Sequence, residues 1–262
     1  YLESPPSLQY DYDYDQVVSF GELISTTIVS EFLAKEGLNC RWFDVRELVR
    51  TDNTWREGKV DWKITEKQIS EKVSAFLDQS EGSPAIALTQ GFMGATPGGD
   101  TTTLGREDSD YTAAIFAYAL QADEMVIWKD VPGLLNADPK YFSRTEKLAS
   151  ISYREAIELS YYGATIIHPK TIKPLQNKDI PLRIKSFVKP GDEGSIIQND
   201  TAADSLIPSF IFKVDQVLIS IIPRDFSFID EQSLSEILAV FASNSIHISL
   251  MQNSAISFSV CV

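Results

Sequence analysis

The sequence has few cysteines and no unbroken apolar run long enough to span a bilayer. Its two cysteines, Cys40 and Cys261, lie far apart and lack the spacing of metal ligands, so a disulfide framework is not indicated and a reducing compartment fits. No signal peptide precedes the first predicted strand. From these absences we expect a cytoplasmic protein with no membrane partner.

Basic residues are also scarce. Lysine and arginine together number 23 against 37 aspartates and glutamates, and the formal net charge is −14. Such a field repels duplex nucleic acid and anionic membranes, so no nucleic-acid partner is expected. A nucleotide site in this chain would need its own local cations, which implies magnesium and a few placed Lys or Arg side chains. The two histidines, His168 and His247, are isolated and are expected to be structural.

The 262 residues fit one large domain followed by a smaller one. In the larger part, helical and strand patterns alternate, which predicts an α/β domain with a mostly parallel sheet covered on both faces. Residues 1–15 are compatible with a solvated tail, an edge segment or a helix, and the sequence leaves the three open. The predicted helices are 20–36, 64–79, 109–122, 152–161 and 169–177, and the predicted strands are 40–45, 85–89, 125–128 and 181–185.

The composition and the pattern of predicted elements change after Asn199. Residues 200–205 are small and polar and are predicted to be a linker. A β-α-β-β pattern follows, which is half of a ferredoxin-like unit and stops at the last residue. We therefore expect one domain over residues 1–200 and a second, partial one over residues 206–262. The elements of the second are predicted at 210–222, 231–243, 246–252 and 256–262.

The segment with the most chemical information is a predicted loop rich in glycine and threonine. It includes Thr89–Gly94 and continues from Gly98 through the sequence Gly-Gly-Asp-Thr-Thr-Thr-Leu-Gly-Arg-Glu-Asp-Ser-Asp-Tyr-Thr-Ala-Ala. It follows a predicted strand and opens a predicted helix, which is where open α/β sheets bind ligands. Glycines let backbone amides approach an anion, and a helix N-terminus adds unpaired N–H donors. The pattern is neither the phosphate-loop signature nor the dinucleotide fingerprint.

Together with Val18-Ser19-Phe20-Gly21-Glu22 and Trp128-Lys129-Asp130-Val131-Pro132-Gly133, this segment closely resembles the aspartate kinases of the amino-acid kinase family. The resemblance runs from about Val17 to Asn199 and more weakly to Val262. It implies the three-layer αβα amino-acid kinase fold for the first domain and a partial ACT regulatory module for the second. Further matches are Trp42–Arg46, Tyr162–Ala164 and Ile167–Pro169.

The resemblance implies roles for individual residues. Glu22 would bind the amino group of aspartate, Arg106 would hold its α-carboxylate, and Ser109 would support the same substrate. Asp110 would organise the catalytic lysine and the metal-phosphate end, so Arg106 and Asp110 are the candidate catalytic residues. ATP and magnesium are the implied cofactors, with no direct protein ligand to the metal. The candidate nucleotide-binding residues are Gly98, Gly99, Lys129, Asp130, Leu135, Lys140 and Thr165.

The chain departs from the family pattern in several places. The family begins with a lysine-phenylalanine-glycine-glycine strand whose lysine contacts the transferring phosphoryl group, and no such motif is present. We therefore expect that residues before Val17 are missing and that this polypeptide has little or no kinase activity. Leu135 replaces a tyrosine and Thr165 replaces a lysine of many relatives, and Glu107 and Asp108 add negative charge, so weaker ATP binding is expected.

The resemblance also bears on regulation and assembly. ACT modules of many relatives bind lysine or threonine at a dimer interface, so a homodimer or larger assembly and a lysine or threonine effector are implied. Ser249 stands where lysine-sensitive relatives have aspartate, and Ala255 where they have glutamate. Weak or absent lysine inhibition is therefore expected.

Plainer interpretations of the same residues remain open. Ser19 to Glu22 fits a capping box at a helix start, and Ser109 and Asp110 could only cap their helix. Tyr111 and Trp128 are expected to be packing residues rather than stacking platforms for a ligand. Other possible functions are an amino-acid kinase for glutamate, acetylglutamate or a nucleotide, a non-catalytic amino-acid sensor, and the front of a fusion with homoserine dehydrogenase.

Overall fold

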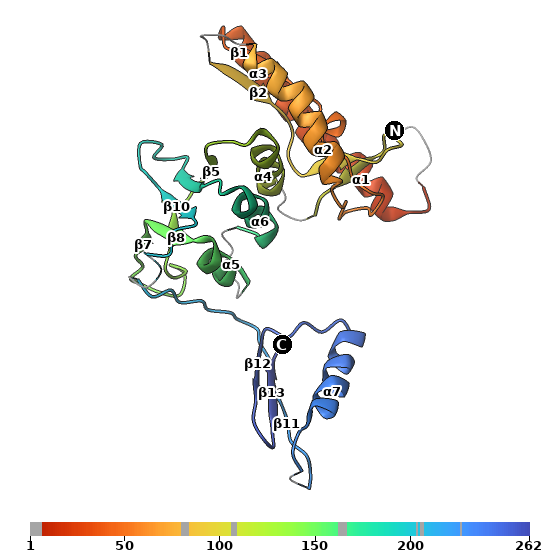
Figure 1. Cartoon of the computed structure of the whole chain (residues 1–262), viewed down its shortest axis with the longest axis vertical. Helices are drawn as coiled ribbons and strands as arrows, with labels where there is room; N and C mark the ends of the chain where they lie inside the picture. The colour runs from red at the N-terminus through yellow and green to blue at the C-terminus, as the bar shows by residue number, and fades with distance from the viewer. Residues whose placement is uncertain are drawn as a thin grey trace. The chain divides into compact units, whose positions relative to one another are not determined.

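The computed structural model describes residues 7–79, 84–105, 109–161, 167–202, 204, 207–225 and 227–262 (Figure 1). The chain divides into two units, Tyr1–Ser209 and Phe210–Val262. Each unit has its own cluster of buried apolar side chains, which in the first includes Leu48, Ile69 and Ile115.

Parallel strand pairs make up the β1–β2 sheet and most of the four-stranded sheet of the first unit. Strand β1 pairs in parallel with β2, and the four-stranded sheet has the order β5-β9-β10-β8, in which the β9–β10 pair is antiparallel and the other two pairs are parallel. The α/β class with a mostly parallel sheet is therefore confirmed. The bounds are β1 Asn39–Trp42, β2 Ala85–Leu88, β5 Met125–Lys129, β8 Ser150–Ser152, β9 Leu182–Ser186 and β10 Ser195–Gln198.

The later helices lie where the apolar periodicity predicts them. The predicted 64–79 helix is continuous in space but passes through a π turn at Ser70–Ser74 between α2 and α3. His168 is structural, as expected, because its Nδ1 accepts a hydrogen bond from the Lys170 amide at the start of α6. The bounds are α2 Trp62–Ile69, α3 Ala75–Asp78, α4 Ser109–Leu120, α5 Tyr153–Tyr161 and α6 Pro169–Lys178.

Helix α1 spans Tyr10–Lys35 and so begins ten residues earlier than predicted. Of the three possibilities for the first residues, the helix is the one found for residues 10–15. The capping-box interpretation is wrong, because Ser19 lies in the middle of the helix, is buried and donates its hydroxyl to the Gln16 carbonyl. Gly37 ends the helix region as predicted, with a φ of +79° that suits glycine.

The polarity of α1 is opposite to that expected of a core helix. Its fully buried residues are polar, Asp15 and Ser19, whereas Ile24, Ile28 and Phe32, which recur near helical spacing in the sequence, are 58–64% exposed. By length and composition alone, α1 could cross a membrane, contrary to the expectation from the sequence. Hydrogen bonds nevertheless tie its polar face to the rest of the unit, so we interpret α1 as part of this fold.

The segment predicted as a glycine- and threonine-rich loop is a buried antiparallel hairpin. Strand β3, Met93–Ala95, pairs with β4, Thr101–Thr103. The loop prediction was wrong because the threonine hydroxyls find partners in the interior: Thr102 bonds Thr51 at 2.6 Å, and Thr103 donates to Asp15 at 2.8 Å. A Cβ at Gly94 would lie 2.7 Å from the Val49 carbonyl oxygen, so glycine permits this close packing. A second short hairpin joins β6, Leu134–Leu135, to β7, Lys147–Leu148.

The second unit has the predicted β-α-β-β order. Its three strands are antiparallel in the order β11-β13-β12, and α7 follows β11 in the chain. Ile229, Phe241, Phe258 and Val260 form its buried core. The bounds are β11 Leu218–Ile221, α7 Glu231–Ser243, β12 Leu250–Asn253 and β13 Phe258–Cys261.

The predicted strand 40–45 ends at Trp42 because Asp44 caps a 3₁₀ turn at Val45–Glu47. Its carboxylate accepts from the backbone amide and side chain of Arg46 at 3.0 and 2.9 Å. Burial acts to raise the pKa of Asp44, but these hydrogen bonds outweigh it and hold the pKa below its ordinary 3.8.

We expect the variant Asp44→Ala to be less stable at neutral pH by about 1 kcal/mol. The native carboxylate has a lowered pKa, so its contribution is present above pH 3.8 and is lost as the pH falls through the folded-state pKa. Urea unfolding at pH 7 and pH 3 measures this. A stability difference of equal size at both pH values would contradict it.

Candidate active site

An ion pair joins two of the sequence motifs: Lys129 belongs to the Trp128–Gly133 motif, and Asp110 to the glycine- and threonine-rich segment. The Lys129 Nζ is 3.3 Å from the Asp110 Oδ2, and the two side chains are 31% and 26% exposed. Lys129 is the last residue of β5, and Asp110 lies in the first turn of α4. The end of a parallel strand beside a helix N-terminus is the usual ligand-binding position of such a sheet, and both the helix and the ammonium favour a bound anion.

The loop after β2 is fixed against the start of α4. A Cβ at Gly91 would lie 2.8 Å from the Ser109 Oγ, so only a glycine allows the backbone to come this close. The next residue, Phe92, donates its amide to the Thr112 hydroxyl at 2.9 Å. The segment that carries Gly91 therefore lies in direct contact with the first turn of α4, which carries Ser109 and Asp110. We call this contact region the corner.

Buried Gln90 connects this corner to α1. Its Nε2 donates to the Thr26 hydroxyl at 2.9 Å, and its Oε1 accepts from the Val45 amide at 2.9 Å. The Thr26 hydroxyl in turn donates to the Glu22 carbonyl at 2.7 Å. The turn of α1 that presents the half-buried Glu22 is thus tied to the residue before Gly91.

The sequence interpretation missed Gln90 and Thr26. The available signal was the position of Gln90, two residues after the apolar strand 85–88, where a polar side chain becomes buried and must find hydrogen-bond partners.

The remaining nucleotide-site candidates follow β5. Asp130 and Lys140 are exposed, and Leu135 is half-buried on β6. The start of β6 is held against β10, because the Leu134 amide donates to the Ser195 hydroxyl at 2.8 Å. These residues continue from the same strand end as Lys129.

Some predicted site residues are not placed by the structure beside the Lys129–Asp110 pair. Gly98 and Gly99 form the turn of the β3–β4 hairpin, while the opposite end of that hairpin, at Phe92, adjoins α4. That turn is held near the start of α1, where the Tyr12 hydroxyl donates to Asp100 at 3.3 Å, so the geometry gives no support to a phosphate role for the two glycines. Arg106 and Thr165 lie outside the described residues, as do Glu107 and Asp108.

Two aromatic residues near the site differ in their environment. Tyr111 packs against the core cluster that includes Leu48, Ile69 and Ile115, as expected. Trp128 was expected to pack as well, but it is 46% exposed, and the Lys185 Nζ lies 5.1 Å from the centre of its ring. The alternation of β5 turns Met125 and Ile127 inward and Trp128 outward. Within the described residues, no cluster of three or more His, Cys, Asp or Glu side chains is arranged to hold a metal ion.

Comparisons with known proteins agree on one family. The model of the amino acid kinase family matches residues 4–186. The chain is 32% identical over 244 residues to lysine-sensitive aspartokinase 3 of Escherichia coli, covering 93% of this chain and 53% of that protein. It is 31% identical to the chloroplastic aspartokinase 1 of Arabidopsis thaliana, covering 90% of this chain and 43% of that protein.

Solved structures give the same result. E. coli aspartokinase III, in a complex with aspartate and ADP, superposes with a TM-score of 0.80 at 30% identity over 97% of this chain and 56% of that one. A UMP kinase from Bacillus anthracis, at 14% identity, has a TM-score of 0.52 over 73% of this chain and 71% of that one, which shows a shared fold alone. The chain spans about half the length of the aspartokinases it matches.

Proposed function

The chain belongs to the amino acid kinase family, and we propose that its protein transfers the γ-phosphoryl group of ATP to the side-chain carboxylate of aspartate. The observation that carries the proposal is the Lys129–Asp110 pair at the α4 N-terminus, in a chain similar along 93% of its length to an aspartokinase. The first unit would be catalytic and the second regulatory. A cytoplasmic location and a homodimeric or larger assembly belong to the same proposal.

The reaction needs no general base on the enzyme. A carboxylate with a pKa of about 4 is already ionised at neutral pH and can attack phosphorus directly. The demands on the protein are in-line positioning and neutralisation of crowded negative charge. The Lys129 ammonium and the α4 N-terminal amides suit that task, and Asp110 holds the ammonium in place. Magnesium, bound with the nucleotide, would supply further positive charge to the phosphates.

The substrate contacts follow from the arrangement of the corner. Glu22 would bind the amino group of aspartate, and Ser109 would contact the same substrate from the first turn of α4. Arg106, which precedes α4 in the sequence, would hold the α-carboxylate. Asp130, Leu135, Lys140 and Thr165 would border the nucleotide. The link from Thr26 through Gln90 to Gly91 supports a common site for Glu22 and Ser109.

The test is ADP release by the protein produced from its complete reading frame, in the presence of ATP and magnesium. Aspartate is expected to stimulate ADP release, whereas glutamate, acetylglutamate and UMP are not. Glutamate is the informative comparison because it differs from aspartate by one methylene. Absence of aspartate-dependent ADP release, with ATP binding intact by calorimetry, would refute the assignment.

Regulation by lysine is expected to be weak, for a reason visible in the second unit. The Lys213 Nζ donates to the Ser249 hydroxyl at 2.6 Å, so an ammonium already lies at the position where lysine-sensitive relatives have aspartate. That charge would repel the side chain of a lysine effector. We expect millimolar lysine to leave the ADP-release rate of the complete protein nearly unchanged. Strong inhibition by lysine at this concentration would contradict this expectation.

A further inference from the structure

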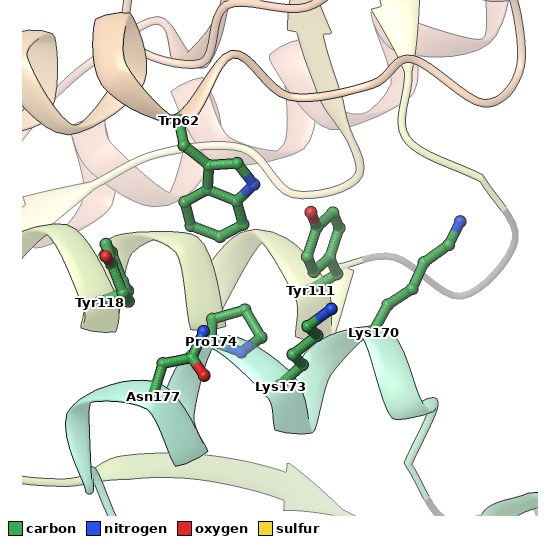
Figure 2. Close-up of a pocket in the computed structure, with 7 residues that line it drawn as sticks. All are labelled: Trp62, Tyr111, Tyr118, Lys170, Lys173, Pro174 and Asn177. Carbon is green, nitrogen blue, oxygen red and sulfur yellow. The ribbon is translucent and has the colours of Figure 1, made fainter.

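A cavity of about 340 Å³ lies on the helical face of the first unit, between α4, α6 and the start of α2 (Figure 2). Its volume falls at the lower end of the range for small-molecule sites. It is lined by Trp62, Tyr111, Tyr118, Lys170, Lys173, Pro174 and Asn177. Neither Asp110 nor Lys129 borders it, so it is separate from the candidate active site.

Three aromatic side chains form one wall of the cavity. The Trp62 ring makes edge-to-face contacts with Tyr111 and Tyr118, with ring centres 6.4 and 5.2 Å apart. Tyr111 and Tyr118 lie seven residues apart and so occupy the same face of α4. All three rings are half-buried, so part of their apolar surface remains open to a ligand. A planar ring placed here would find edges and faces to stack on.

The opposite wall is positively charged. Helix α6 carries Lys170, Lys173 and Lys178 and contains no acidic residue, in a chain whose net charge is −14. Figure 2 shows the Lys173 side chain directed toward Tyr111, with Pro174 between it and Asn177. Among the described residues Lys173 makes no ion pair within 4.0 Å.

Nearby carboxylates reduce the positive charge of this wall only slightly. Lys170 lies 4.0 Å from Glu57, whose side chain is 73% exposed, and such a pair contributes little in water. Lys178 also lies 4.0 Å from a carboxylate, that of Glu66, and its ammonium is 4.7 Å from the centre of the Tyr118 ring. The ammonium of Lys173 is therefore available to a ligand that enters between the aromatic wall and α6.

We propose that this cavity binds a small planar aromatic molecule that carries an anionic group. The ring would stack against Trp62 and Tyr118, and the carboxylate or phosphate would accept hydrogen bonds from Lys170 and Lys173. The Asn177 amide at the edge offers one further donor and acceptor. The aromatic wall alone would also accept a neutral ring, so the contribution of the two lysines is what distinguishes this proposal.

Calorimetric titration of the chain with two isosteric probes tests it. 2-Naphthoate is expected to bind with one site per chain, and the uncharged 2-naphthamide about tenfold more weakly, because a charge-assisted hydrogen bond is lost. 2-Naphthyl phosphate in a third titration separates a phosphate ligand from a carboxylate ligand. Absence of binding by both anions at millimolar concentration, or equal binding of the naphthoate and the amide, overturns the proposal.

Lysine variants test whether 2-naphthoate binds in this cavity. Lys170→Met/Lys173→Met is expected to weaken 2-naphthoate about tenfold. The matched control Lys147→Met, which removes an exposed lysine on β7, is expected to leave binding unchanged. Circular dichroism and urea midpoints check that each variant is folded. Saturating ATP with magnesium should not displace the probe, so failure of the kinase assignment and failure of this proposal remain distinguishable. Displacement by ATP, or unchanged binding in the double variant, would show that the probe binds elsewhere.

Discussion

Replacement of Lys129 by methionine is expected to lower the aspartate-dependent rate of ADP release about 10²- to 10³-fold, the effect of removing one preorganised charge stabiliser from a transition state. The ammonium is held 3.3 Å from Asp110 in a partly buried corner, where charge acts more strongly than at the surface. Methionine has a similar length but no charge. The measurement is steady-state kinetics of the complete protein, with kcat and KM for ATP and aspartate determined separately.

Two controls make this result interpretable. Lys72→Met removes an exposed lysine whose Nζ lies 2.9 Å from Glu47, and the rate should stay within about twofold, since such surface pairs contribute little. Asp110→Asn keeps the shape of the side chain but removes the charge that positions Lys129, so kcat should fall while KM for aspartate changes less. Equal rates for Lys129→Met and Lys72→Met would remove Lys129 from the mechanism.

The second large effect is expected on stability, from Asp15. This carboxylate is fully buried and accepts three hydrogen bonds, from the Thr103 amide, the Thr103 hydroxyl and the Arg56 amide, at 3.0, 2.8 and 2.8 Å. Asp15→Ala would leave these donors without a partner inside the fold. We expect a loss of about 3 kcal/mol in the free energy of unfolding, measured by urea titration.

Asp11→Ala is the matched control, since it removes the same kind of side chain one turn earlier in α1. The Asp11 carboxylate pairs with Arg56 at 3.2 Å, but both side chains are about half exposed. Its loss should change the stability by less than about 1 kcal/mol. If the two variants lose equal stability, the burial of Asp15 is not what stabilises the contact between α1 and β4.

Local sequence patterns determined much of this fold. Helical patterns in the sequence predicted the helices around Ile69, Ile115 and Ile172, and in the structure Asp61 and Asp230 cap two of the predicted helices. These signals are strong because they depend on neighbours three or four residues away. The order of the motifs also led to the amino acid kinase family, and the Asp110 and Lys129 that those motifs contain lie together in space.

Only the tertiary structure decided which polar residues are interior. Asp15 lies in an acidic, tyrosine-rich stretch that looks like surface, and Thr103 lies in a segment that looks like loop. Both are buried, because Thr103 donates its amide and its hydroxyl to the Asp15 carboxylate across 88 residues of sequence. The outward-facing apolar stripe of α1 and the cavity between α4 and α6 also depend on distant segments. Periodicity shows that a helix has two faces, whereas the direction that each face takes is set by what packs against it.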